Sequence, residues 1–297
     1  MSADAQAKAP VADKLSAYLA VLKREAEMYG ARPKVEIKCD FSYTLSLPAS
    51  KVDRDIVTVP EVFAGAAVAP VKALARAVGA APKEEGKNAI TEFPVLQDVQ
   101  CAFRPGEITL VLAPPGHGKT ALLKALAGCL PAGSLPDSAV TYGGLTAAEL
   151  EAKGTSVNRL CAYVEQVDTH LPFLTVRETA AFSHDNSCPP PPATPEGRAL
   201  HADKLEAVTS LLALEGCIDT IIGDDLVRGV SGGEKKRVTV AEALVTNARA
   251  LCMDEISTGL DAAVTFNIVA ALRAWARATD GTAVVALLQP TPEVFEQ

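Results

Sequence analysis

The residues best suited to chemistry form a glycine-containing loop, which follows an apolar run at 108–112 and opens a predicted helix at 119–129. Glycine lets backbone N–H groups turn inward around phosphate oxygens, and a helix N-terminus adds the positive end of its dipole. The Lys119 ammonium would reach the terminal phosphates of a nucleotide, and the Thr120 hydroxyl would ligate Mg²⁺. The predicted phosphate-binding residues are Ala113, Pro114, Pro115, Gly116, His117, Gly118, Lys119, Thr120 and Ala121.

One position of this loop departs from the usual phosphate-binding pattern. Ala113 stands where the first glycine belongs. A methyl group is tolerated there if φ is negative, so we expect phosphate binding to be weakened rather than lost. Taken alone, the motif also fits an ordinary glycine and proline turn before a helix.

A second motif places two acids at the end of an apolar run at 250–253. Asp254 is positioned to hold Mg²⁺ through water, and Glu255 to orient or deprotonate an attacking water molecule. Acids often end buried strands without any catalytic role, so this pattern indicates a site only in combination with the other motifs.

A third motif begins a predicted helix with a serine and two glycines. Ser231 and Glu234 have the spacing of a capping box. Gly232 and Gly233 would expose the backbone at the start of the helix and make an anion site. An ordinary capped helix is the alternative, but two glycines in a first turn cost stability and suggest that a ligand approaches closely.

The run from Val230 to Arg237 resembles the signature motif of ABC ATPases. Gln166 lies between the phosphate loop and this run, where that family keeps a glutamine that touches Mg²⁺ and contacts the transporter. Residues 257–261 resemble the family's D-loop, which crosses the dimer interface. Segments 33–37, 175–179, 253–261 and 287–293 extend the resemblance to the first nucleotide-binding domain of pleiotropic-drug-resistance transporters, the full-length members of the ABC G subfamily.

This resemblance implies an α/β fold. A RecA-like P-loop NTPase core would carry an antiparallel β subdomain and a helical subdomain at about 167–246, which contains the signature. Two such domains would sandwich two ATP molecules, each held by the phosphate loop of one partner and the signature of the other. The implied cofactors are ATP and Mg²⁺. The implied partners are a second nucleotide-binding domain and the transmembrane domains of a transporter.

The resemblance also assigns roles to particular residues. The catalytic residues would be Lys119, Glu255 and Gln289. Gln289 occupies the position of the switch histidine of most ABC ATPases, and its amide cannot carry a positive charge to the γ-phosphate. The metal would be held by Thr120, Gln166 and Asp254. Beyond the phosphate loop, the residues implied to contact ATP are Gln166, Ser231, Gly232, Gly233 and Glu234.

The sequence pattern divides the chain into an N-terminal segment and one domain. Residues 1–33 form a tail and an amphipathic helix, whose apolar face would hold Leu15, Leu19, Leu22 and Ala26. Residues 34–297 form the nucleotide-binding domain, with strands at 35–47 and 95–103 and short helical structure at 62–79. Because the chain ends at Gln297, just past the switch position, we expect a C-terminally truncated domain.

Composition narrows the classes of function. A formal net charge of -8 and a pI near 5.1 give no global basic field, so no nucleic-acid partner is expected. Seven cysteines without a paired spacing indicate reduced thiols rather than a zinc site or a disulfide framework. No run reaches the roughly 18 apolar residues of a membrane span. We therefore expect a soluble fragment that reaches the cytoplasmic face of a membrane through transmembrane domains outside this chain.

These observations favour an ATP-binding and ATP-hydrolysing domain that powers an ABC-type exporter of hydrophobic compounds or lipids. One alternative is a regulatory nucleotide-binding domain with impaired hydrolysis, which Ala113 and Gln289 favour and Lys119, Asp254 and Glu255 oppose. Another is a soluble ABC ATPase acting on ribosomes or DNA. That class predicts basic arms, long charged helices or a second cassette, and the sequence contains none of these.

Overall fold

The computed structural model describes residues 11–30, 33–48, 90–190, 194–260, 262–288 and 292–295. The chain divides into two compact units, Met1–Phe41 with Asp98–Gln297, and Ser42–Gln97. The candidate site residues that the structure describes all belong to the first unit. Gln289, Asp261 and the predicted helical segment at 62–79 lie outside the described residues.

A parallel sheet forms the centre of the first unit. Its strand order is β3-β7-β6-β5, and every neighbouring pair is parallel. The inner strands β6 and β7 are buried along their whole length, as expected of strands covered on both faces. The strands are β3 (Ile108–Val111), β5 (Cys161–Val164), β6 (Ala250–Asp254) and β7 (Thr282–Ala286). The apolar runs at 108–112 and 250–253 therefore form the expected strands.

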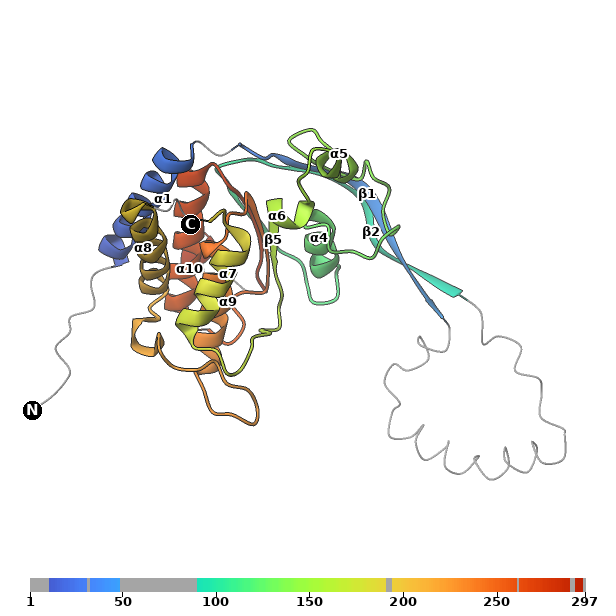
Figure 1. Cartoon of the computed structure of the whole chain (residues 1–297). Helices are drawn as coiled ribbons and strands as arrows, with labels where there is room; N and C mark the ends of the chain where they lie inside the picture. Colours follow the sequence, from blue (N-terminus) through green and yellow to red (C-terminus); the bar gives the residue numbers. More distant parts are fainter. Residues whose placement is uncertain are drawn as a thin grey trace, which may run out of the picture. The chain divides into compact units, whose positions relative to one another are not determined.

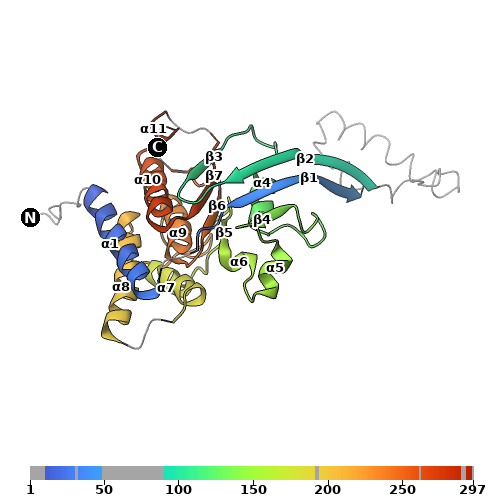
Figure 2. The ribbon, with the colours of Figure 1, turned by 90° about the horizontal axis from the view of Figure 1, so that it is seen from above.

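Helices cover both faces of this sheet. Figures 1 and 2 show α4 (Lys119–Leu126) on one face, with α9 (Gly232–Val245) and α10 (Ala262–Thr279) on the other. Trp275 of α10 is 2% exposed and packs tightly against Gly281, where an added Cβ would lie 2.5 Å from the indole ring. This layered α/β arrangement confirms the predicted P-loop NTPase core.

A second, antiparallel sheet has the strand order β2-β1-β4. It contains β1 (Ile37–Pro48), β2 (Ile90–Phe103) and β4 (Val140–Tyr142), and Cys39 of β1 pairs with Val140 of β4. The outer parts of β1 and β2 belong to the second unit. The antiparallel β structure expected near the N-terminus is therefore present.

The helix α1 (Val11–Tyr29) packs against α8 (Pro195–Leu211) and α10. Its buried face holds Tyr18, Val21 and Leu22, and it continues to Glu25 rather than to Ala26, which is exposed. The predicted apolar face is therefore rotated, because the Glu25 carboxylate is buried in an ion pair with Lys204, at 2.9 Å. Position 25 could be identified as buried only with knowledge of α8.

Four further α-helices and one 3-10 helix complete the described elements. They are α5 (Ala147–Ala152), α6 (Val157–Leu160), α7 (Val176–Ser187), the 3-10 helix η1 (Glu215–Cys217) and α11 (Pro292–Phe295). Within the described ranges, no helix has both the length and the apolarity needed to span a bilayer.

Candidate active site

The predicted phosphate loop connects β3 to α4. Gly116 has φ 78° and Gly118 has φ 79°, a left-handed backbone that glycine adopts without strain. Gly118 is the N-cap of α4, and no side chain caps the helix. The first N–H groups of α4 therefore have no side-chain acceptor, and the helix start is open to an anion.

Ala113 has the negative φ at which a methyl group is tolerated in this position of the loop. Among the described non-glycine residues, positive φ occurs only at Asp98, Ala213, Glu255 and Asp280. Ala113 therefore has a backbone that an L-residue adopts readily, and its methyl group imposes no strain on the loop.

Lys119 lies across the inside of the loop. Its side chain is buried, and Nζ donates to the carbonyl oxygens of Ala113, at 2.8 Å, and Pro114, at 3.2 Å. The same Nζ lies 3.8 Å from Glu255 Oε1. The ammonium thus links the phosphate loop to the acid that follows β6.

Asp254 ends β6 and is completely buried. Its Oδ2 accepts a hydrogen bond from Thr120 Oγ1 at 2.6 Å and from the Tyr163 hydroxyl at 3.4 Å. Burial, with Asp254 nearby, raises the pKa of Tyr163, so this phenol remains a donor. The second oxygen, Oδ1, has no hydrogen-bond partner among the described residues. A buried carboxylate oxygen without a partner is costly, and a cation would relieve that cost.

Glu255 adopts an unusual backbone conformation directly after β6. Its φ is 51°, and its N–H donates to the Ala286 carbonyl oxygen at 2.9 Å. Gln166 Nε2 donates to Glu255 Oε2 at 2.5 Å. Such a left-handed conformation in a residue other than glycine costs about 1–3 kcal/mol and is often found at functional sites. The structure therefore brings Lys119 and Gln166 to the same carboxylate.

The Ser231 motif forms the predicted capping box at the start of α9. Glu234 N–H donates to Ser231 Oγ at 3.3 Å, and Ser231 N–H donates to Glu234 Oε2 at 2.7 Å. These bonds from the Ser231 backbone and hydroxyl lower the pKa of the Glu234 carboxyl. In the described part of the chain, no hydrogen bond or ion pair joins 231–234 to 113–120. The two motifs are thus not assembled into one site within this chain.

A buried polar network, which the sequence did not reveal, links the segment after β5 to α9. Lys236 is 2% exposed, and its Nζ donates to the Gln166 carbonyl oxygen at 2.7 Å and contacts Asp168 Oδ1 at 2.8 Å. The Thr239 hydroxyl lies 2.6 Å from the same Asp168 oxygen and 3.0 Å from His170 Nε2. The three-residue spacing of Lys236 and Thr239 puts both on one helix face, and this spacing is the feature of the sequence that could have indicated the network.

We expect Lys236→Met to slow ATP turnover more than it weakens ATP binding. Loss of the ammonium frees the Gln166 backbone, and a hydrogen bond to a charged group contributes about 1.5 kcal/mol or more, equal to about tenfold in rate. Measurements of kcat and of ATP affinity would separate the two effects. Lys235→Met is the matched control, because Lys235 Nζ contacts the Gly223 carbonyl oxygen instead. Equal losses in kcat and affinity, or a comparable loss in the control, would contradict this role.

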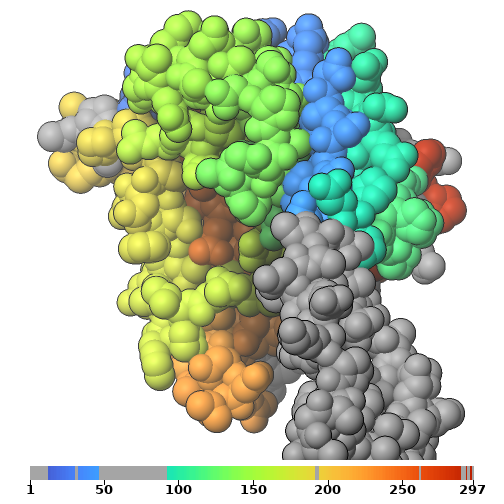
Figure 3. Space-filling view, turned by 90° about the vertical axis from the view of Figure 1, so that its right-hand side faces the viewer, coloured from blue at the N-terminus to red at the C-terminus, as the bar shows by residue number. Residues whose placement is uncertain are grey.

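A groove lies beside this network. Its volume is about 320 Å³, and its lining includes Val167, Thr239 and Glu242. Figure 3 shows a hollow on this side, with orange atoms, the colour of α9, at its floor. Large apolar side chains nearby in the sequence are highly exposed, namely Val167, Leu171, Phe173 and Phe182. Exposed apolar residues mark a contact surface where they form a contiguous patch.

The fold and the phosphate loop define the class of P-loop nucleotide-binding proteins. A family profile described as ABC transporter matches residues 96–258. A putative ATP-binding protein of an ABC transporter from Pyrococcus furiosus has a similar fold, with a TM-score of 0.53 at 16% identity, over 67% of this chain and 87% of that one. The chain belongs to the ABC transporter family.

The most informative relatives come from plants. ABC transporter G family member 53 of Oryza sativa subsp. japonica is 37% identical over 96% of this chain. Pleiotropic drug resistance protein 1 of Petunia hybrida is 41% identical over 69% of this chain. The matched regions make up 21% of the rice protein and 16% of the petunia protein. The chain thus corresponds to an ATPase domain within much longer ABC G transporters.

Proposed function

We propose that this chain binds ATP with Mg²⁺ at the loop between β3 and α4 and hydrolyses it to power a transmembrane transporter. The observation that carries this proposal is the convergence of five side chains from three segments of the chain. Thr120 contacts Asp254 at 2.6 Å, while Gln166 and Lys119 both approach Glu255, at 2.5 and 3.8 Å. Such a set combines phosphate binding, metal binding and activation of water in one place.

The residues present fit a magnesium ion. The unpartnered Asp254 Oδ1 and the Thr120 hydroxyl are hard oxygen donors, which Mg²⁺ prefers. Thr120, Asp254 and Gln166 would hold the ion, with Asp254 acting through water. A bound Mg²⁺ neutralises charge on the phosphate oxygens and fixes their orientation.

The chain's own residues supply the remaining functions. The Lys119 ammonium moves from the carbonyl oxygens of Ala113 and Pro114 to the phosphates, exchanging neutral acceptors for charged ones. The Glu255 carboxylate accepts a proton from the attacking water. The Gln166 amide holds that carboxylate in place through its hydrogen bond.

A second nucleotide-binding domain would complete the site. The Ser231 capping box starts α9 away from the phosphate loop and can donate backbone N–H groups to a nucleotide held by a partner. The groove beside Val167 and its exposed apolar neighbours would receive a cytoplasmic segment of the transmembrane domains. We further propose that the transporter exports hydrophobic compounds or lipids, as the resemblance of the motifs to pleiotropic-drug-resistance transporters implies.

Substitution of Lys119 tests nucleotide binding. A charge-assisted phosphate contact contributes about 1.5–3 kcal/mol, so Lys119→Ala should weaken ATP binding by about ten- to a hundredfold. Titration with a fluorescent ATP analogue measures the affinity, and Lys153→Ala, at an exposed lysine outside the loop, should bind as the wild type does. Equal affinities for Lys119→Ala and the wild type would contradict the proposed site.

A further inference from the structure

A second group of possible metal ligands lies on helices that contribute nothing to the candidate active site. His184 and Asp185 lie in the last turn of α7, and His201 lies on α8. The ligand atoms of these three side chains all lie within 4.8 Å of one another. Two imidazoles and a carboxylate form a donor set typical of zinc sites with an open position.

The separations between donor atoms match those around a bound metal ion. His201 Nε2 lies 3.2 Å from Asp185 Oδ1, and His184 Nδ1 lies 3.4 Å from the same oxygen. Zinc ligands lie about 2.0–2.2 Å from the metal, which places neighbouring tetrahedral ligands roughly 3.3 Å apart. The carboxylate oxygen is thus already at coordination spacing from both imidazole nitrogens.

The His201 nitrogen provides an independent indication. Its Nε2 is buried and makes no hydrogen bond with acceptable geometry in the described residues, despite the nearby carboxylate. The two rings stack with centroids 4.1 Å apart and an angle of 16° between their planes. Coordination would tilt the rings toward the ion by rotation about χ2, which is a soft torsion in histidine. A metal ion would then satisfy the buried nitrogen.

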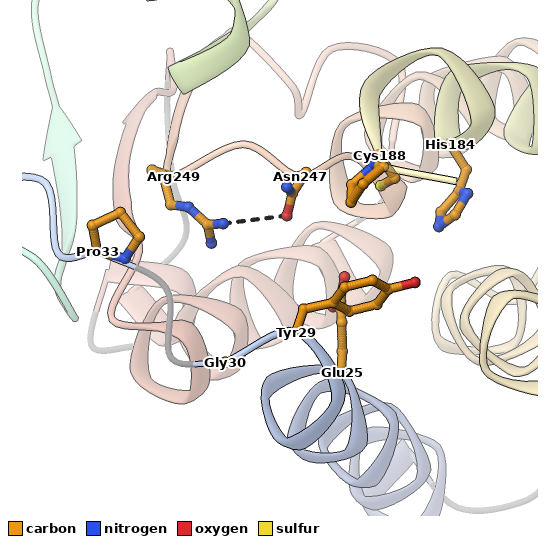
Figure 4. Close-up of a pocket in the computed structure, with 9 residues that line it drawn as sticks. Glu25, Tyr29, Gly30, Pro33, His184, Cys188, Asn247 and Arg249 are labelled. Carbon is orange, nitrogen blue, oxygen red and sulfur yellow. Dashed lines mark hydrogen bonds between the residues drawn. The ribbon is translucent and has the colours of Figure 1, made fainter. Parts of the chain in front are cut away.

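The surroundings allow entry of an ion and contain little uncompensated positive charge. Of the three side chains, His184 lines a pocket of about 240 Å³, and Figure 4 shows His184 and Cys188 on the side of the pocket opposite Arg249. The nearby Lys204 is buried in its ion pair with Glu25. The Asp185 side chain is 60% exposed, so water can complete the coordination shell.

We propose that His184, Asp185 and His201 bind one divalent transition-metal ion, preferably Zn²⁺, with water in the remaining position. Imidazole nitrogen favours Zn²⁺ over Mg²⁺ and Ca²⁺, which prefer oxygen ligands. The ion would join the end of α7 to α8 and stabilise this helical pair, because a ligand that binds only the folded state raises its stability.

Zinc binding by the full chain tests the proposal. The accessible cysteines are first alkylated in the folded chain, and the Zn²⁺ affinity is measured by competition with a chromogenic chelator. We expect one ion per chain. His201→Ala and Asp185→Asn should each weaken binding by at least about tenfold, since even changes around a metal ligand cost 10–100-fold. Asp203→Asn, at an acid of α8 that pairs with Arg24 instead, should leave the affinity unchanged.

Two further readouts distinguish this site from adventitious binding. Co²⁺ should give visible absorption bands without thiolate charge transfer, and His201→Ala should lose them. Zn²⁺ should raise the Tm of the wild type, reversibly with a chelator, and leave the Tm of His201→Ala unchanged. The absence of stoichiometric binding, equal affinities in wild type and His201→Ala, or bands arising from thiolate coordination would each overturn the proposal. Because Lys119→Ala leaves these ligands intact, its Zn²⁺ affinity should equal that of the wild type.

Discussion

Replacing Glu255 with glutamine is expected to abolish most ATP turnover while leaving ATP binding intact. The carboxylate lies 2.5 Å from Gln166 Nε2 and 3.8 Å from Lys119 Nζ, where it can accept a proton from water near the phosphates. Glutamine keeps the size and a hydrogen-bond acceptor but cannot act as a base at neutral pH. General base catalysis contributes about 10²–10⁴ in rate, so the loss should fall in that range.

Two assays are needed, both at a protein concentration at which two chains associate. Turnover is followed by phosphate release, and binding by titration with a fluorescent ATP analogue. Glu107→Gln, at an exposed acid before β3, serves as a control for the loss of one negative charge. A Glu255→Gln protein that hydrolyses ATP at the normal rate would remove Glu255 from its catalytic role. If the wild type binds ATP without turning it over, the regulatory alternative gains support.

Changes at Ser231 are expected to impair hydrolysis at the nucleotide held by the partner. The Ser231 capping box has no contact with the phosphate loop of its own chain within the described residues. Removal of preorganised donors of this kind typically costs about 10²–10³ in rate. Ser231→Arg, which places a bulky side chain over the exposed helix start, should therefore lower turnover by a similar factor without loss of ATP binding to the same chain.

A mixture of two inactive proteins provides a sharp test of this arrangement. In a mixed pair of Glu255→Gln and Ser231→Arg chains, one site combines an intact Glu255 with an intact Ser231, and the other contains both defects. Activity should therefore reappear on mixing, although each protein alone is nearly inactive. If mixing restores nothing while pairing of the two chains is verified by sedimentation, the two motifs act within one chain and the shared site is wrong.

Local motifs make much of the fold and site predictable from the sequence. The phosphate loop, the acids after 250–253 and the Ser231 capping box depend on neighbours in the chain. The loop, the strand before it and the start of the helix after it occur where the pattern places them. The burial of aromatic residues in strands is harder to predict. Tyr43 of β1 is buried, whereas Phe93 of β2 is 38% exposed.

Features that depend on packing between distant segments could not be predicted. Lys236 would ordinarily be assigned to a solvated helix face, yet it is buried against Gln166 and Asp168. Glu25 is buried only because Lys204 of α8 lies opposite it. The cluster of His184, Asp185 and His201 likewise requires α7 and α8 to meet. Sequence periodicity shows which side of a helix is apolar, but it does not identify the element that packs against that side.

The steady-state ATPase rate per mole of chain, measured against protein concentration, tests the central claim most directly. We predict that the chain binds Mg²⁺-ATP, turns it over very slowly when dilute, and gains activity more than linearly as concentration drives pairing. The expected gain is about 10²–10³, the contribution of the donors supplied by the partner. A high rate per mole that stays constant down to dilutions where sedimentation detects only monomer would contradict the account, because the site would then be complete within one chain.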